Sequence, residues 1–66
     1  MQLTINGERK EYAAPMTIDA LLETLGLREK YVAVEHNFEA VSYTKYDEVP
    51  LADGDRLEIV TLVGGG

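Results

Sequence analysis

The chain has 66 residues and a formal net charge of −6, from twelve acidic against six basic side chains. A chain of this length folds as one domain and buries only about 60% of its unfolded surface, which leaves little room for an enclosed substrate cavity. The acidic balance disfavours nucleic acid and anionic membranes as partners and favours basic protein surfaces. The sequence contains no cysteine, which excludes disulfides, thiolate zinc sites and a cysteine nucleophile.

The N-terminus carries no sign of a targeting segment. No charged and then apolar leader follows Met1, and no apolar run approaches the roughly 20 residues that a membrane span needs. We therefore expect a cytoplasmic protein that is not processed at its N-terminus.

The first residues predict a β-hairpin. Leu3 and Ile5 alternate with polar neighbours, which is the period of a half-buried strand. Asn6-Gly7 is a strong signal for a tight turn, because both residues tolerate positive φ. The returning strand, residues 8–13, is mostly polar and is expected at an edge or with one solvated face.

A helix is predicted next. Pro15 ends the strand, Thr17 can act as the N-cap, and Gly26 supplies the left-handed position at which a helix stops. Between them runs one apolar stripe at helical spacing, formed by Ile18, Leu21, Leu22 and Leu25.

The second half of the chain predicts three strands. A short β-branched and aromatic run predicts a buried strand at 31–35, and Asp53-Gly54-Asp55 marks the turn into a last strand at 56–63. Between these two strands we expect a turn at 36–39 and a weak return strand at 40–43. An irregular segment or a single helical turn should follow at 44–48.

These elements predict an α+β domain with the β-grasp (ubiquitin-like) fold, in which one helix covers one face of a mixed sheet of four to five strands. The first and last strands should lie side by side and parallel. We expect the domain to span residues 1–63 and the remaining residues, 64–66, to form a flexible glycine tail.

The last strand offers a possible docking patch. If the helix covers the face that bears Leu57 and Ile59, Val60 and Leu62 are exposed on the other face beside the tail. We predict that these two residues bind a partner. The alternative is that so small a patch has no function, or that the weak strand shields it.

The usual catalytic signals are absent. His36 is the single histidine, and its place in a turn predicts an ordinary exposed side chain. Asp53-Gly54-Asp55 lacks the spacing of a calcium loop, and Asp47 and Glu48 have no evident pocket. We expect no catalytic residue, no metal site and no cofactor bound by the chain itself.

What remains is the carboxylate of Gly66. Three extended residues reach about 10 Å, so glycines anchored by a strand could carry a terminal carboxylate into a narrow cleft. A carboxylate accepts sulfur or an amine only after activation, usually by transfer to AMP from ATP. The chain has no nucleotide site, so an activating enzyme must use the ATP. A glycine tail left by cloning is the competing explanation.

The chain resembles the ThiS family, the small ubiquitin-like sulfur carrier proteins of thiamine thiazole synthesis. The similarity covers nearly the whole length, and its most specific part runs from the Asp-Gly-Asp turn to the terminal glycines. The other marks are Asn6-Gly7, the helix at 17–25, Val32-Ala33-Val34 with Asn37, and the stretch from Pro50 to Val60.

The resemblance implies a definite cycle. An E1-like enzyme would adenylate the carboxylate of Gly66, and a cysteine desulfurase or sulfur relay protein would then supply sulfur to form a thiocarboxylate. Thiazole synthase would receive the sulfur. Gly64 and Gly65 would let the backbone approach closely in each cleft. The chain would be a carrier protein and a co-substrate of other enzymes, not an enzyme.

Two departures and two alternatives accompany the resemblance. The pattern leads us to expect a glycine where Phe38 follows Asn37, and a proline-arginine pair near Ser42-Tyr43, so the resemblance implies no partner contacts for this region. The first alternative is the small subunit of molybdopterin synthase, which uses the same chemistry. The second is a ubiquitin-like protein modifier or a simple binding module.

Overall fold

The alternation of Leu3 and Ile5 with polar residues gives the first strand one buried face. In the computed structural model, which describes residues 1–62, strand β1 spans Gln2–Ile5 and pairs antiparallel with β2, Glu8–Glu11. The turn between them places Asn6 at φ 51° and Gly7 at φ 85°, as the Asn-Gly pair predicts. All four residues of β2 are exposed, and β2 lies at an edge of the sheet.

Helix α1, Ile18–Thr24, forms where the apolar stripe predicts it. The Thr17 side chain accepts a hydrogen bond from the Ala20 backbone N–H at 3.2 Å and so caps the helix. Gly26 takes φ 74° after the last turn, which confirms the predicted stop. The stripe faces the sheet, with Ile18, Leu21 and Leu22 buried.

The next elements form a second hairpin and a short 3₁₀ turn. Strand β3, Val32–His36, pairs antiparallel with β4, Glu39–Val41. The 3₁₀ turn η1, Tyr43–Lys45, follows β4 and leads into a buried Tyr46. The segment after η1 contacts the start of α1 through a hydrogen bond from the Ile18 N–H to the Val49 carbonyl, at 3.1 Å.

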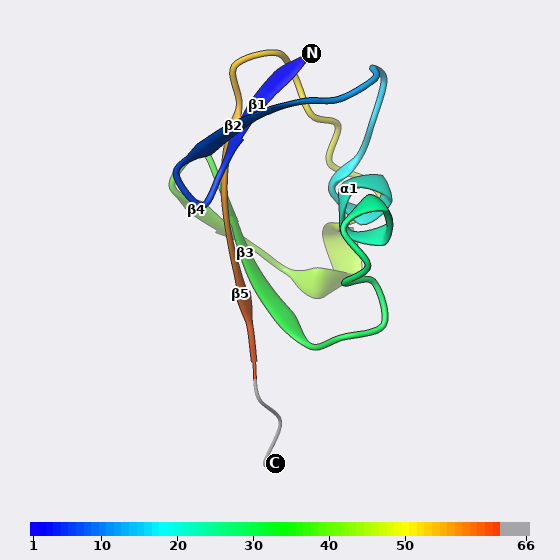
Figure 1. The fold of residues 1–66 in the computed structure, drawn as a ribbon. Coiled ribbons are helices and arrows are strands. Elements are labelled where there is room, and N and C mark those ends of the chain that lie inside the picture. The colour runs from blue at the N-terminus through cyan, green and yellow to red at the C-terminus, as the bar shows by residue number, and fades with distance from the viewer. Residues whose placement is uncertain (63–66) are drawn as a thin grey trace.

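Strand β5, Arg56–Thr61, completes a five-stranded sheet in the order β2-β1-β5-β3-β4. It is parallel to β1 and antiparallel to β3. Figure 1 shows α1 on one side of this sheet and β5 running through the sheet toward the C-terminal end. The predicted mixed sheet with one helix, and the parallel pairing of the first and last strands, are confirmed.

The core lies between α1 and the sheet. Its members are apolar side chains from α1 and the three central strands, together with two residues of the long connection before β5. The buried residues are Leu3, Ile5, Ile18, Leu21, Leu22, Val32, Val34, Tyr46, Leu51, Leu57 and Ile59. Among residues 1–62, the structure contains no helix of the length and hydropathy that a membrane crossing requires.

Several predicted bounds were wrong by one or two residues. The returning strand stops at Glu11, and β3 begins at Val32 and continues through His36. The weak strand is β4, so it starts one residue earlier than predicted and ends before Tyr43. Val63, predicted as the end of the last strand, and the glycine tail at 64–66 lie outside the described residues.

Candidate functional site

The two ends of β5 have different surroundings. At its start, the turn Asp53-Gly54-Asp55 is joined to β1: Gly54 N–H donates to the Gln2 carbonyl at 2.7 Å, and Thr4 N–H donates to the Asp55 carbonyl at 3.0 Å. The Asp53 carboxylate also accepts from the Gln2 backbone N–H at 2.6 Å. Gly54 has φ 88°, as the turn requires. The start of β5 is therefore held on the β1 side.

The middle of β5 is held by a side chain. The Asn6 amide accepts from Ile59 N–H at 2.7 Å and donates to the Ile59 carbonyl at 3.0 Å. The Asn6 side chain therefore makes the two hydrogen bonds to Ile59 that a backbone residue would make if β1 continued along β5. Asn6 was predicted only as a turn residue, and this second role joins positions 53 apart in sequence.

The last residues of β5 present apolar side chains. Leu57 and Ile59 are buried under α1, and by strand alternation Val60 projects from the uncovered face of the sheet. The exposed fractions of Val60 and Leu62 are 57% and 51%. This confirms their predicted exposure, while their role in binding stays a prediction.

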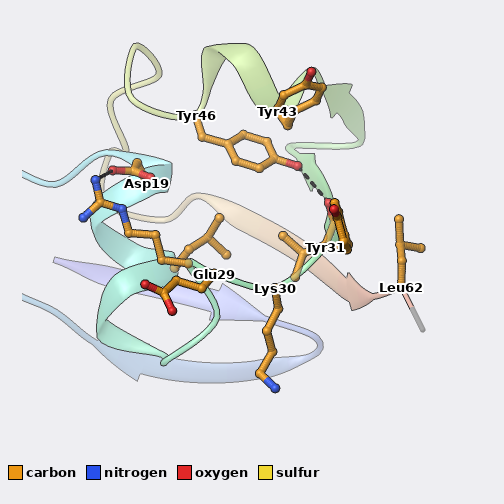
Figure 2. A pocket seen from close by; sticks show the side chains of 10 residues that line it. Asp19, Glu29, Lys30, Tyr31, Tyr43, Tyr46 and Leu62 are labelled. Carbon is orange, nitrogen blue, oxygen red and sulfur yellow. Dashed lines mark hydrogen bonds and ion pairs between the residues drawn. The ribbon is translucent and has the colours of Figure 1, made fainter. Parts of the chain in front are cut away.

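Leu62 also lines a groove of about 470 Å³, which we call the tyrosine groove. Its apolar lining consists of Leu22, Tyr31, Val32, Tyr43, Tyr46 and Leu62. Figure 2 shows the three tyrosine side chains gathered on the side of the groove that leads to Leu62. Tyr31 and Tyr43 are 79% and 78% exposed, so this part of the groove is open to solvent.

Tyr46 forms the fixed wall of the tyrosine groove. Its hydroxyl donates to the Val32 carbonyl at 3.2 Å (Figure 2). Burial raises the pKa of the Tyr46 phenol, so the hydroxyl stays a neutral donor. The groove therefore combines one tyrosine that packs in the core with two that are exposed to solvent.

Charged side chains border the tyrosine groove. The Arg28 guanidinium lies 3.2 Å from an Asp19 carboxylate oxygen and 2.9 Å from one of Glu23. Glu29 and Lys30 complete this border. Exposed pairs of this kind contribute at most about 1 kcal/mol to stability, so their main effect is on the sign of charge that a partner meets.

His36 is not the ordinary exposed residue that its predicted turn position indicated. It is the last residue of β3, its side chain is 20% exposed, and its Nε2 lies 2.6 Å from an Asp55 carboxylate oxygen. The prediction was wrong because β3 extends one residue further and pairs His36 with Leu57, next to the Asp-Gly-Asp turn.

Asp55 collects several donors in this cluster. Besides His36, the Ala52 backbone N–H donates at 2.9 Å and the Asn37 amide at 3.1 Å. Partial burial raises the pKa of the Asp55 carboxyl, but these hydrogen bonds outweigh it, and the net pKa is lowered. The cluster fixes the β3–β4 turn to the start of β5. Within residues 1–62, no three histidine, cysteine or acidic residues are placed together as a metal site requires.

Comparison with known protein families shows to which family the chain belongs. The model of the ThiS family matches residues 3–66. The chain belongs to the ThiS family. A crystal structure of the thiamine biosynthesis protein ThiS from Geobacter metallireducens has the same fold, with a TM-score of 0.85, 33% identity and full coverage of both chains.

Two curated relatives differ in length. The chain is 42% identical over 65 residues to the sulfur carrier protein ThiS of Bacillus subtilis, covering 97% of this chain and 98% of that protein. It is also 50% identical over 66 residues to a thiazole synthase of Paramagnetospirillum magneticum. That match covers all of this chain but only 20% of the synthase, so the chain spans about a fifth of that protein's length.

Phe38, at the position where the ThiS resemblance leads us to expect glycine, is 77% exposed. It has φ 70°, in the left-handed region, and the guanidinium carbon of Arg56 lies 5.3 Å from its ring centroid. The strain of this conformation and the cation–π contact act in opposite directions. The departure is visible in the sequence but the contact is not, because Arg56 approaches Phe38 through the pairing of β3 with β5.

Proposed function

We propose that this ThiS-family chain is a sulfur carrier whose Gly66 carboxylate becomes a thiocarboxylate that supplies sulfur for the thiazole of thiamine. The observation that carries the proposal is the match to the family over residues 3–66, which includes the terminal glycines. Gly64, Gly65 and Gly66 themselves lie outside the described residues. The proposal requires that Gly66 carry a free carboxylate.

The chemistry proceeds in defined steps. The Gly66 carboxylate attacks the α-phosphate of ATP on an E1-like enzyme, releasing pyrophosphate and forming an acyl-adenylate. A persulfide sulfur, supplied by a cysteine desulfurase or a relay protein, displaces AMP and leaves an acyl disulfide. A thiol then cleaves the S–S bond and releases the thiocarboxylate. In each step the carrier supplies only the reacting carbonyl group, and the other proteins supply the catalytic groups.

Thiazole synthase is the proposed acceptor. The chain is similar over its whole length to a segment of the thiazole synthase of Paramagnetospirillum magneticum. This supports a carrier that works beside a synthase as its co-substrate.

The test is the intact mass of the chain after incubation with the adenylating enzyme, ATP and the sulfur source. We expect an increase equal to the replacement of one oxygen by sulfur. A chain lacking Gly65 and Gly66 is the matched control and should show no change. The ThiS protein of Bacillus subtilis confirms that the relay is active. If it gains sulfur and this chain does not, or if this chain forms conjugates with lysines instead, the proposal is wrong.

Val60 and Leu62 are the proposed docking patch for these enzymes. Both are exposed, and only Val63 separates Leu62 from the first glycine in the sequence, so an enzyme that binds the glycines also approaches these two side chains. We expect Val60→Ala and Leu62→Ala each to raise the KM for the carrier about threefold to tenfold, because truncation of one interface side chain commonly costs about 1 kcal/mol. Phe38→Ala, at the opposite end of β5, should leave this KM unchanged. Equal effects at both ends would contradict the patch.

A further inference from the structure

The hydrogen bonds of β5 alternate between its two neighbours. Leu62 N–H donates to the Tyr31 carbonyl at 2.7 Å, and Asn37 N–H donates to the Arg56 carbonyl at 2.8 Å, so the even-numbered residues bond toward β3. The backbone N–H and carbonyl groups of the odd-numbered residues therefore point toward the β1 side. Asn6 N–H donates to the Leu57 carbonyl at 2.9 Å, which agrees with this alternation.

On the β1 side, the pairing ends before β5 does. The register of β1 against β5 comprises Thr4 with Arg56 and Ile5 with Leu57, and the hairpin then turns back. The Asn6 amide satisfies Ile59. Thr61, the next odd-numbered residue, has no hydrogen bond on this side to any residue of the described range 1–62. Figure 1 shows the lower half of β5 continuing past the β1–β2 hairpin with β3 beside it.

An unpaired N–H and carbonyl on a strand edge form a template for another strand. An extended peptide that pairs there gains main-chain hydrogen bonds, and its side chains can contact those of the flanking residues. The flanking residues are Val60 and Leu62, both about half exposed. The Asn6 side-chain amide bonds both backbone groups of Ile59 and so takes the place of a strand residue there. The unpaired edge of β5 therefore begins after Ile59.

We propose that the edge at Thr61 accepts an extended segment of the adenylating enzyme, which adds as a strand on the side that β1 leaves free. This inference rests on the proposed function and deepens it, because it specifies how the enzyme grips the chain before the glycines. The acidic net charge of −6 disfavours a second copy of the chain as the occupant and favours a segment that carries basic side chains.

The test is Thr61→Pro, which removes the N–H donor from the free edge. Proline is tolerated on a strand where the N–H faces solvent, so the fold should be retained. Arg9→Pro is the matched control. In β2, Tyr12 N–H donates to the Met1 carbonyl at 2.8 Å, so by alternation the N–H of Arg9 faces outward at the other edge.

Binding to the adenylating enzyme is measured by calorimetry for both variants, with thermal unfolding as the check on folding. We expect Thr61→Pro to weaken binding about tenfold, since a carbonyl of the enzyme loses its donor, while Arg9→Pro binds like the unmodified chain. A synthetic chain with an ester in place of the Thr61 amide removes the same N–H without the proline ring. It should give the same loss even if Thr61→Pro unfolds.

The outcomes separate the two proposals. If the ester variant binds like the unmodified chain, the edge inference is overturned and the sulfur carrier function stands. If the unmodified chain binds the enzyme but gains no sulfur from an active relay, the proposed sulfur carrier function is wrong. The comparison of binding between the unmodified chain and the ester variant still tests the strand pairing at Thr61. If the unmodified chain does not bind, or if sedimentation shows a dimer that the ester abolishes, the edge inference is overturned.

Discussion

The start and the end of β5 belong to one strand but have different surroundings. The start is held by β1, by the Asp-Gly-Asp turn and by the cluster of His36, Asn37 and Asp55. The end has β3 on one side, no hydrogen-bonded neighbour among residues 1–62 on the other side at Thr61, and two exposed apolar side chains. The difference shows how one strand of so small a domain can be anchored at its start and leave side chains exposed at its end.

The largest expected difference between the two ends is in the cost of truncating a leucine. Leu57 is completely buried, so Leu57→Ala should lower the free energy of unfolding by about 3 kcal/mol. Leu62→Ala, at the open end, should change it by less than about 0.5 kcal/mol. Urea unfolding of both variants measures the contrast, and equal losses would show that the end of β5 is part of the core.

The Asn6 amide marks the boundary between the two ends. Asn6→Gly keeps the positive φ of the turn but removes both hydrogen bonds to Ile59, which we expect to lower the free energy of unfolding by about 2 kcal/mol. Hydrogen exchange of the Ile59 amide should accelerate more than that of Val60, which bonds toward β3. An unchanged Ile59 exchange rate would contradict the role assigned to Asn6.

The carboxylate of Asp55 makes the start of β5 sensitive to acid. Its pKa is lowered on folding from the ordinary value of 3.8, so its contribution to stability is present above that value and is lost as the pH falls through the folded pKa. Asp55→Asn should lower the free energy of unfolding at neutral pH by about 1.5 kcal/mol.

The pH dependence separates this electrostatic contribution from a packing effect. The difference between the parent chain and Asp55→Asn should shrink between about pH 5 and about pH 2, as the carboxyl of the parent is protonated. Urea unfolding across this range checks the prediction. A difference that does not change with pH would mean that the carboxylate charge is not what holds the cluster together.

The smallest expected effect concerns Phe38 in the turn beside the start of β5. Phe38→Gly removes the strain of a positive φ, worth about 1 kcal/mol or more, and loses a cation–π contact of about 0.5 kcal/mol, so the variant should be slightly more stable. Phe38→Ala keeps the strain and loses the contact, so it should be less stable. Thermal unfolding compares the two, and the opposite order would show that the Arg56 contact outweighs the strain.

The fold was predictable because each element has a local signal. Asn6-Gly7 predicts the first turn, Thr17 and Gly26 bound the helix, and Asp53-Gly54-Asp55 predicts the entry to β5. These residues act through their own φ angles and through backbone groups a few positions away. Given one helix and the order of the strands along the chain, the apolar faces of these elements can be buried together in only a few sheet arrangements.

The cluster around Asp55 and the free edge at Thr61 were not predictable in the same way. His36 meets Asp55 across the register of β3 against β5, and a one-residue difference in the bounds of β3 changes which residues meet. The Asn6 amide reaches Ile59 because β1 ends where β5 continues. Such contacts depend on where strands stop relative to one another, which local propensity does not determine.

The tyrosine groove gives the molecule a built-in optical reporter. The chain contains four tyrosines and no tryptophan, so its near-ultraviolet signal comes mainly from these rings. Tyr31 and Tyr43 stand largely in water at the mouth of the groove, whereas Tyr46 is enclosed. A protein that covers this mouth removes water from the two exposed rings and can bring its own tryptophans within range of energy transfer. Complex formation at this end can therefore be followed by fluorescence on the unlabelled chain.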